Sequence, residues 1–430
     1  MRILLLGATG LIGSAVAARL AAERHELVGV TRTFGAPARR LPVARWIKLD
    51  LRNVTAPDDW LPHLAGIEAV VNCAGVLQDS PRDSTAAAHR DGPSTLWKAC
   101  ERAGVRRVIH FSAMGVDRGG LTDFSRSKLA GDEALTARDL DWVILRPSVV
   151  VGRQAYGGSA LFRGLAAFSV LPRTPDAGPL DIVQLDDVTE TVVRLLRPDA
   201  PSRVALELAG PERLGFDEVV AAYRAWLGRR PAQIVDAPGF VMAAAYRLGD
   251  LVAKLGWRPP IRSTARREIV RGAIGDPSAW IDATGIRPRS LSDALAAEPA
   301  SVQERWFSNL YLLKPLIIGV FALFWLMTGL VSLGPGYGHA KHLMLVAGGG
   351  SLAGPSVVAG GLADIIVGLG ILYRPTTRLA LLAAFAISIV YIVAGTILLP
   401  VLWADPLGPM MKIWPILVLN LVALAVLEER

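Results

Sequence analysis

The sequence predicts an α/β protein built on a doubly wound parallel sheet with a smaller irregular lobe, followed by an all-α domain of four transmembrane helices. Three observations support this fold class. Short apolar runs alternate with helical stretches over residues 1–150, which is typical of a parallel sheet covered on both faces. A glycine-rich turn follows the first of these runs. Charged residues become scarce near the C-terminal end, where only ten of the chain's 46 basic and 38 acidic residues lie beyond residue 309.

Six apolar runs are expected to form the strands of the sheet. They are residues 2–6, 26–31, 45–50, 68–75, 105–113 and 140–148. Because crossover connections between parallel strands are right-handed, a doubly wound order is the simplest topology for them. The first 20 residues also resemble a secretory signal, but regularly spaced glycines interrupt the apolar run and favour a strand followed by a turn.

Beyond residue 150 the alternation loosens, and the chain is expected to form the smaller lobe. Residues 182–196 are predicted as a strand leading into a helix, and residues 204–228 as a strand, a turn and a helix, all within this lobe. Residues 231–300 are rich in Pro, Arg and Gly, and residues 231–308 are assigned only as an irregular lobe and linker. The expected domains are therefore residues 1–230, 231–308 and 309–430.

Four segments of the last domain are apolar enough to cross a bilayer, which requires about 20 residues per helix. They are residues 312–333, 355–373, 379–400 and 411–427. Arg305, Lys314, Arg374 and Arg378 flank the spans on one side, whereas Lys341 and Lys412 fall on the other. Because positive charge near span ends stays in the cytoplasm, we expect a multi-pass protein of the bacterial inner (cell) membrane, with both termini and the N-terminal domain cytoplasmic.

Two polar residues lie inside these spans. Asp364 is in the middle of the second span, with Gly360 and Gly368 four residues to either side on one helical face. A carboxyl group in hydrocarbon is costly and usually faces a bundle interior or a pathway, and small residues let another helix approach closely. Asn420 in the fourth span is a candidate hydrogen-bonding partner for Asp364. A protonated aspartate with a purely structural role is the alternative to a functional one.

The glycine-rich turn has the spacing of a phosphate-binding loop. Gly7, Gly10 and Gly13 lie between a predicted strand and a predicted helix. Glycine lets the backbone turn tightly and approach a pyrophosphate, and the helix that follows offers free N–H groups to it. A glycine turn without a ligand is the alternative. The position of the turn after an N-terminal strand favours a dinucleotide.

The ends of the second and third predicted strands bear on which dinucleotide binds. An acidic residue at the end of the second strand would bind the ribose of NAD, but this chain has Thr31 and Arg32 there. Arg32 can bind a 2′-phosphate with two hydrogen bonds, which favours NADP(H) over NAD(H); the alternative is a solvated surface arginine. Asp50 follows the third strand and is expected either to accept from the adenine amino group or to cap a helix.

Several motifs resemble the short-chain dehydrogenase/reductase superfamily, in particular its extended and atypical branches. In chain order they are GATGLIG, KLDL, VNCAG, HFSA, RSKLAGDEAL and VILRPSVVVG. LELAGPERLGFDEVV resembles the subgroup that includes the nucleotide-binding accessory subunit of respiratory complex I. The tail resembles the DoxX-like membrane family through GGLADIIVGLGILYRPTTRLA. The first resemblance covers about residues 1–230 and implies an NAD(P)-binding Rossmann domain with a substrate lobe.

The resemblance also implies, position by position, a set of cofactor-binding residues. They are Gly7, Thr9, Gly10, Leu11, Ile12 and Gly13 for the pyrophosphate; Asp50 and Leu51 beside the adenine; Ala74 and Gly75 beneath the cofactor; Lys128 for the nicotinamide ribose hydroxyls; and Pro147 to Val150 near the nicotinamide.

Both catalytic hydroxyls of the superfamily are missing. Its tyrosine corresponds to Phe124, four residues before Lys128, and its serine corresponds to Met114. A phenyl ring cannot donate a proton, and general acid catalysis contributes about 10²–10⁴-fold to a rate. Lys128 therefore remains as the candidate catalytic residue, and reduction of ordinary ketones is not expected.

Two functions are compatible with these residues. One is an NAD(P)H-dependent reductase that passes hydride to a lipophilic acceptor such as a quinone, which needs less activation than a ketone. The other is a non-catalytic NADP(H)-binding scaffold, assembly or redox-sensing protein of the membrane. The net charge of +8 is spread along the chain, so no nucleic-acid partner is expected. Cys73 and Cys100 lack metal-ligand spacing, so no metal is expected either. The oligomeric state is left open.

Overall fold

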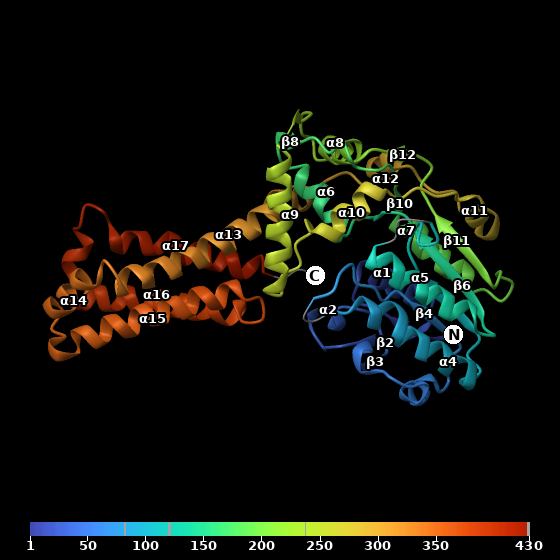
Figure 1. The fold of residues 1–430 in the computed structure, drawn as a ribbon, viewed down its shortest axis with the longest axis horizontal. Coiled ribbons are helices and arrows are strands. Elements are labelled where there is room, and N and C mark those ends of the chain that lie inside the picture. Colours follow the sequence, from blue (N-terminus) through green and yellow to red (C-terminus); the bar gives the residue numbers. More distant parts are fainter. Residues whose placement is uncertain (81–82, 119–121, 237, 428–430) are drawn as a thin grey trace. The chain divides into compact units, whose positions relative to one another are not determined.

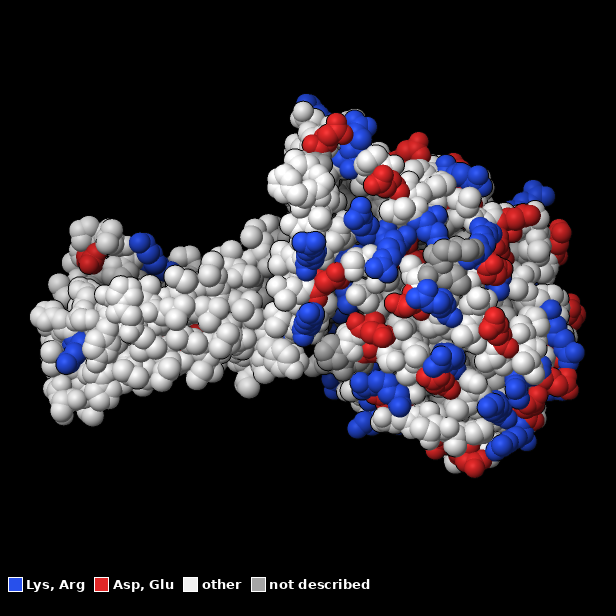
Figure 2. All heavy atoms as spheres, in the orientation of Figure 1, with Lys and Arg blue, Asp and Glu red and all other residues white. Residues whose placement is uncertain are grey.

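The computed structural model describes residues 1–80, 83–118, 122–236 and 238–427 (Figure 1). It consists of two compact units. The sheet unit comprises Met1–Asp250 and Pro259–Ser308, and the helical unit comprises Leu251–Arg258 and Asn309–Arg430. Charged side chains cover the visible face of the sheet unit and are sparse on that of the helical unit (Figure 2).

Seven parallel strands form the main sheet, in the order β11-β6-β5-β4-β1-β2-β3. They are β1 Arg2–Leu6, β2 Glu26–Thr31, β3 Arg45–Lys48, β4 Ala69–Asn72, β5 Arg107–Phe111, β6 Asp141–Pro147 and β11 Val204–Leu208. The first six lie where the sequence predicted them, and the doubly wound sheet is confirmed. The strand order reverses between β1 and β4, and ligands of such sheets bind at the carboxyl ends of the strands beside that reversal.

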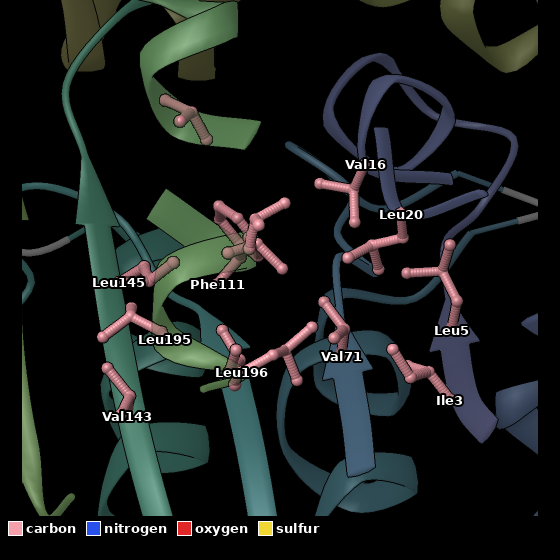
Figure 3. Packing of buried hydrophobic residues seen from close by; sticks show 14 of the residues in the cluster. Ile3, Leu5, Val16, Leu20, Val71, Phe111, Val143, Leu145, Leu195 and Leu196 are labelled. Atoms are coloured by element: carbon pink, nitrogen blue, oxygen red, sulfur yellow. The ribbon is translucent and has the colours of Figure 1, made fainter. Parts of the chain in front are cut away.

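The inner strands are apolar on both faces, as strands of a covered parallel sheet are. Successive side chains point to opposite faces, so Leu4 of β1 belongs to one core and Ile3 and Leu5 to the other. In the second of these cores, Val16 and Leu20 of α1 (Leu11–Ala22) pack over Ile3 and Leu5 (Figure 3). The two cores hold the loops at the strand ends in fixed positions.

Helices cover both faces of the sheet. On one face lie α1, α7 (Leu185–Leu195) and α11 (Ser278–Thr284); on the other lie α3 (Leu61–Leu64), α4 (Gly92–Ala103) and α5 (Asp123–Thr136). Helix α4 shows why these segments are helical: Leu96, Trp97 and Cys100 share a buried face, while Lys98 is exposed. It ends at Gly104, whose φ of 74° is the left-handed conformation that favours glycine.

Two elements that the sequence assigned to the smaller lobe are part of the main sheet and its helical layer instead. β11 pairs in parallel with β6, and α7 packs against α1 over the sheet. Glu190 of α7 accepts from Arg19 of α1 at 3.0 Å, which ties the two helices together. The prediction was wrong because pairing between distant parallel strands leaves no local signal in the sequence. The lobe itself contains α6 (Gly157–Leu165), α8 (Phe216–Trp226) and α12 (Leu291–Ala297), around Phe162, Phe216 and Tyr223.

Among the described residues, three helices are long and apolar enough to span a membrane. They are α13 (Val302–Leu333), the segment Gly350–Leu372 that contains α15 (Ala353–Leu372), and α16 (Thr377–Leu398). The fourth predicted span is α17 (Pro409–Ala425), which has 17 residues and is shorter than the others. A further helix that was not predicted, α14 (Tyr337–Val346), lies between the first two spans in the chain.

The small residues of α15 allow close contact with α13. A Cβ built on Gly361 would lie 2.7 Å from Leu333 Cγ, and one built on Gly368 would lie 2.6 Å from Leu326 Cγ. The expected pairing of Asp364 with Asn420 is wrong. Tyr391 of α16 donates to Asp364 at 3.1 Å, and Asn420 donates to the Leu381 carbonyl at 3.1 Å. Both residues thus have a hydrogen-bond partner on α16.

Replacing Tyr391 by phenylalanine should destabilise the helical unit by about 1 kcal/mol, because Asp364 loses its hydroxyl donor inside an apolar bundle. The measurement is unfolding of the purified protein by sodium dodecyl sulfate in mixed micelles. Tyr373→Phe, at the end of α15, is the matched control. Equal midpoints for the two variants would contradict the assignment.

Candidate functional site

The turn after β1 brings three backbone segments into contact. Gly7 has φ +70°, and a Cβ there would lie 2.6 Å from the Cys73 carbonyl carbon at the end of β4. A Cβ on Gly13 would lie 2.2 Å from the Gly7 carbonyl oxygen. Gly10 differs, because its hypothetical Cβ has only the Gly7 oxygen nearby, at 3.3 Å. The fold itself therefore requires glycine at positions 7 and 13, whereas at position 10 it leaves space beside the turn.

The first turn of α1 offers hydrogen-bond donors at the same place. Gly10 is the N-cap, with extended backbone and no capping side chain, and the first turn contains no acidic residue. The first N–H groups of a helix have no partner within the helix. Those of Leu11, Ile12 and Gly13 are thus positioned for an anion, as at helix N-termini that bind phosphate. Thr9 lies in the turn between Gly7 and Gly10.

The end of β4 forms the floor beside this turn. Ala74 N–H donates to the Asn72 side chain at 3.0 Å, which fixes the strand exit. A Cβ on Gly75 would lie 3.3 Å from Lys128 Nζ and 3.5 Å from His89 Nε2. Gly75 therefore leaves room for the side chains of Lys128 on α5 and His89 in the segment before α4.

Lys128 is the central charged group of the site. Its side chain is buried, and its ammonium donates to the Phe111 carbonyl at 2.7 Å and to the Ala74 carbonyl at 3.3 Å. Burial lowers the pKa of Lys128 to about 8, against the opposing effect of Asp132. An ammonium has three protons, so one remains for a ligand hydroxyl.

His89 lies next to Lys128 and was not identified from the sequence. Its Nε2 accepts from Val76 N–H at 3.0 Å, so the ring proton is on Nδ1 and points to Ser127 Oγ at 2.7 Å. Burial, and then the charge of Lys128, lower the pKa of His89 to about 2, so the ring stays neutral. No motif or periodicity distinguishes this histidine, since only the fold brings it to α5.

Phe124 stands one helical turn before Lys128, where the superfamily has its tyrosine. Its ring meets the edge of the His89 ring at a centroid distance of 5.4 Å. Met114 is buried and lies against Gly275, whose hypothetical Cβ would be 2.5 Å from Met114 Cε. Neither position carries a group that can polarise a carbonyl.

The hydroxyl groups of Ser112 and Thr122 are already bound to carboxylates. Ser112 donates to Asp132 at 2.8 Å. Thr122, the N-cap of α5, donates to Glu268 of α10 (Ser263–Arg271) at 2.5 Å. Arg271 fixes that carboxylate at 2.5 Å and also donates to the Met114 carbonyl at 3.2 Å. Helix α10 thus contributes to the site, which the irregular composition of residues 231–308 did not reveal.

Two arginines and two carboxylates gather where β2 and β3 end. Arg32 pairs with the buried Asp83 at 2.9 Å. Asp50 caps the short helix Leu51–Asn53 and accepts from Arg52 N–H at 3.0 Å. Its contact with an adenine amino group stays a prediction. Hydrogen bonds from the Arg52 guanidinium lower the pKa of Asp50. Arg52 was not identified from the sequence, and Arg32 is more than a solvated surface residue.

The remaining predicted residues lie after β6. The Pro147 carbonyl accepts from Met114 N–H at 3.2 Å, which joins the ends of β5 and β6. Val150 begins β7 (Val150–Val151), which pairs with β10 (Val183–Gln184). All predicted cofactor-binding positions therefore follow the carboxyl ends of the strands or, like Lys128, face them. Among the described residues, no three His, Cys, Asp or Glu side chains group as metal ligands.

Two family models match the chain in separate parts. Residues 7–166 match the NAD(P)H-binding family, and residues 322–421 match the DoxX-like family. The chain therefore joins an NAD(P)H-binding domain to a DoxX-like membrane domain. The DoxX-like domain and its apolar helices associate the protein with a lipid bilayer.

Similar proteins each match part of the chain. An uncharacterised protein of Mycobacterium tuberculosis is 28% identical over 222 residues, which are 52% of this chain and 23% of that protein, so the match spans about a quarter of its length. A ceramide reductase of Caulobacter vibrioides is 25% identical over 254 residues, 56% of this chain and 76% of that protein. The structure of the Bordetella bronchiseptica enzyme WbmG in complex with NAD has a TM-score of 0.54 at 20% identity, covering 72% of this chain and 96% of that one. It shares the fold.

Replacing Gly13 by alanine should destabilise the NAD(P)H-binding domain by about 3 kcal/mol, because the added methyl group collides with the Gly7 carbonyl. Gly10→Ala, in the same turn, should cost less than about 1 kcal/mol, because Gly10 already has extended backbone and more space. Thermal unfolding of the two variants followed by circular dichroism tests this. A Gly10 variant as unstable as the Gly13 variant would contradict it.

Dinucleotide affinity should fall about tenfold as the pH rises through about 8, because the Lys128 ammonium loses the charge that it carries below its pKa. Isothermal titration across this range measures the effect. The dependence should vanish in Lys128→Met and persist in Lys98→Met, an exposed lysine on α4. A pH dependence that survives in Lys128→Met would contradict the assignment.

Proposed function

We propose that the protein is a membrane-anchored NADPH-dependent reductase whose acceptor is an electron-poor lipophilic molecule of the quinone class. One observation carries this proposal. Phe124 and Met114, which have no proton to donate, occur in the same chain as an apolar membrane domain. A reduced nicotinamide dinucleotide, when bound, supplies the hydride. The acceptor takes up that hydride and one proton from water, which completes its reduction.

The residues of the chain hold the reactants and do not activate a carbonyl. The N–H groups of Leu11, Ile12 and Gly13 would bind the pyrophosphate, and Lys128 would donate to the nicotinamide ribose. Ser112 and Thr122 already donate to Asp132 and Glu268, so they do not replace the missing phenol. A ketone would therefore lose the contribution of a general acid, about 10²–10⁴-fold. Reduction of a quinone, which accepts electrons readily, would lose less of its rate.

Preference for NADP(H) over NAD(H) is part of the proposal. The end of β2 carries Thr31 and Arg32 and no acidic side chain. Arg32 and Arg52 both lie in the cluster beyond β2 and β3, where the charge of Arg32 also acts on Asp50 and that of Asp83 also acts on Arg52. A 2′-phosphate would compete with Asp83 for Arg32, and two guanidinium groups suit its charge.

Attachment of the NAD(P)H-binding domain to a membrane is consistent with a lipophilic acceptor. The distribution of Arg305, Arg374 and Arg378 at one side of the spans supports a cytoplasmic NAD(P)H-binding domain in a bacterial inner membrane, with α17 as a fourth crossing. The Caulobacter vibrioides relative is named for the reduction of ceramide, a lipid. That name is consistent with a substrate drawn from the membrane.

A second function, a non-catalytic NADP(H)-binding scaffold or redox sensor, rests on the same replacement of the phenol by Phe124. In that case bound nucleotide stabilises the domain by mass action, and no acceptor is reduced. The two functions differ in turnover alone.

The test is an acceptor screen with the full-length protein in lipid nanodiscs. NADPH and short-chain quinones are added, and oxidation of NADPH is followed by its absorbance. We expect turnover in the wild type and none in Gly10→Asp, whose side chain fills the space left beside the turn. NADPH binding without turnover on any quinone would support the scaffold and contradict the reductase.

A further inference from the structure

Helix α9 (Gly239–Lys254) exposes a continuous apolar face. Phe240, Leu248 and Leu251 are 76%, 60% and 57% exposed, and Val241 and Ala244 are exposed with them. Residues 240, 244, 248 and 251 recur at the spacing that places side chains on one side of a helix. Large exposed apolar patches mark sites of interaction with proteins or membranes.

The part of α9 that belongs to the sheet unit, residues 239–250, is fixed to that unit on its opposite face. A Cβ on Gly249 would lie 1.8 Å from the Ile261 carbonyl oxygen, so this backbone is in close contact with the chain that follows. Arg266 of α10 lies over the Tyr246 ring at 5.7 Å. Both contacts leave Phe240 and Leu248 exposed.

The chain leaving α9 is bonded to the end of a membrane span. Within the helical unit, Trp257 Nε1 donates to the Leu372 carbonyl at 2.7 Å, and Leu372 is the last residue of α15. Arg374 N–H donates to the Leu255 carbonyl at 3.0 Å, and its guanidinium lies over the Trp257 ring at 5.3 Å. Tryptophan and arginine at the end of a span are typical of the membrane–water interface. The C-terminal end of α9 is thus tied to that interface.

Basic residues border the apolar face. Arg247 and Lys254, seven residues apart, are both exposed on one edge of it, and Arg258 follows the helix. A helix with this arrangement can bury its apolar face at the headgroup boundary while its basic side chains extend to anionic headgroups. A surface for a second protein would not require this basic edge or the connection to a span.

We propose that α9 is an in-plane lipid-binding helix, with Phe240, Leu248 and Leu251 inserted into a leaflet that contains anionic lipid. The bilayer is the occupant of the exposed face. The inference is independent of catalysis, and it gives the NAD(P)H-binding domain a second attachment to the membrane besides the spans.

Site-directed spin labelling of the full-length protein tests this directly. Cys73 and Cys100 are replaced by alanine, and a nitroxide is attached at Leu248→Cys, at Phe240→Cys or, as a control, at Arg102→Cys on an exposed part of α4. The protein is reconstituted in vesicles of phosphatidylcholine and phosphatidylglycerol. Collision rates of the label with oxygen, which concentrates in lipid, and with a water-soluble nickel complex are then compared.

We expect the ratio of oxygen to nickel collisions at positions 240 and 248 to exceed that at position 102 several-fold. A ratio equal to the control would overturn the proposal, because the face would then be in water. Shielding from both reagents would also overturn it, since a second copy or another protein would then cover the face. Circular dichroism of each labelled protein confirms that it is folded, and labelling at two positions guards against a local disturbance at either one.

Discussion

The contact of the Gly7 turn with the start of α1 and the exit of β4 is the constraint on which the NAD(P)H-binding domain depends. The Gly7 carbonyl occupies the space that a side chain at position 13 would need, and Gly7 itself lies against the Cys73 carbonyl. This close approach places the first N–H groups of α1 beside the reversal of strand order between β1 and β4. Gly10, in the same turn, leaves the space beside it that a diphosphate would need.

Beyond the turn, most polar groups of the site have hydrogen-bond partners within the protein. Lys128 is bound to two carbonyls, His89 is kept neutral, and the hydroxyls around Phe124 donate to carboxylates. Neither Phe124 nor Met114 has a proton to donate to a carbonyl. The proposed function follows from this: the site would reduce only acceptors that need little activation, or would bind a nucleotide without turnover.

The parts of this architecture that were predictable have local signals. β1 to β6 are short apolar runs, and the glycine spacing is read directly from neighbouring positions. The place of β11 beside β6 depends on pairing between segments some 60 residues apart, and no local pattern encodes it. The partner of Asp364 was also mispredicted, because a helical pattern shows which residues face a bundle but not which neighbouring helix they meet. His89 and Glu268 reach the site only through the fold, so the sequence alone did not distinguish them from other polar residues.

The most direct measurement of the central claim is isothermal titration of the full-length wild-type protein and its Gly10→Asp variant with NADPH and with NADH. The account predicts saturable binding of at least NADPH to the wild type and none to the variant, with both proteins equally folded by circular dichroism. Absence of binding of either nucleotide to the folded wild type, or undiminished binding to Gly10→Asp, would contradict it.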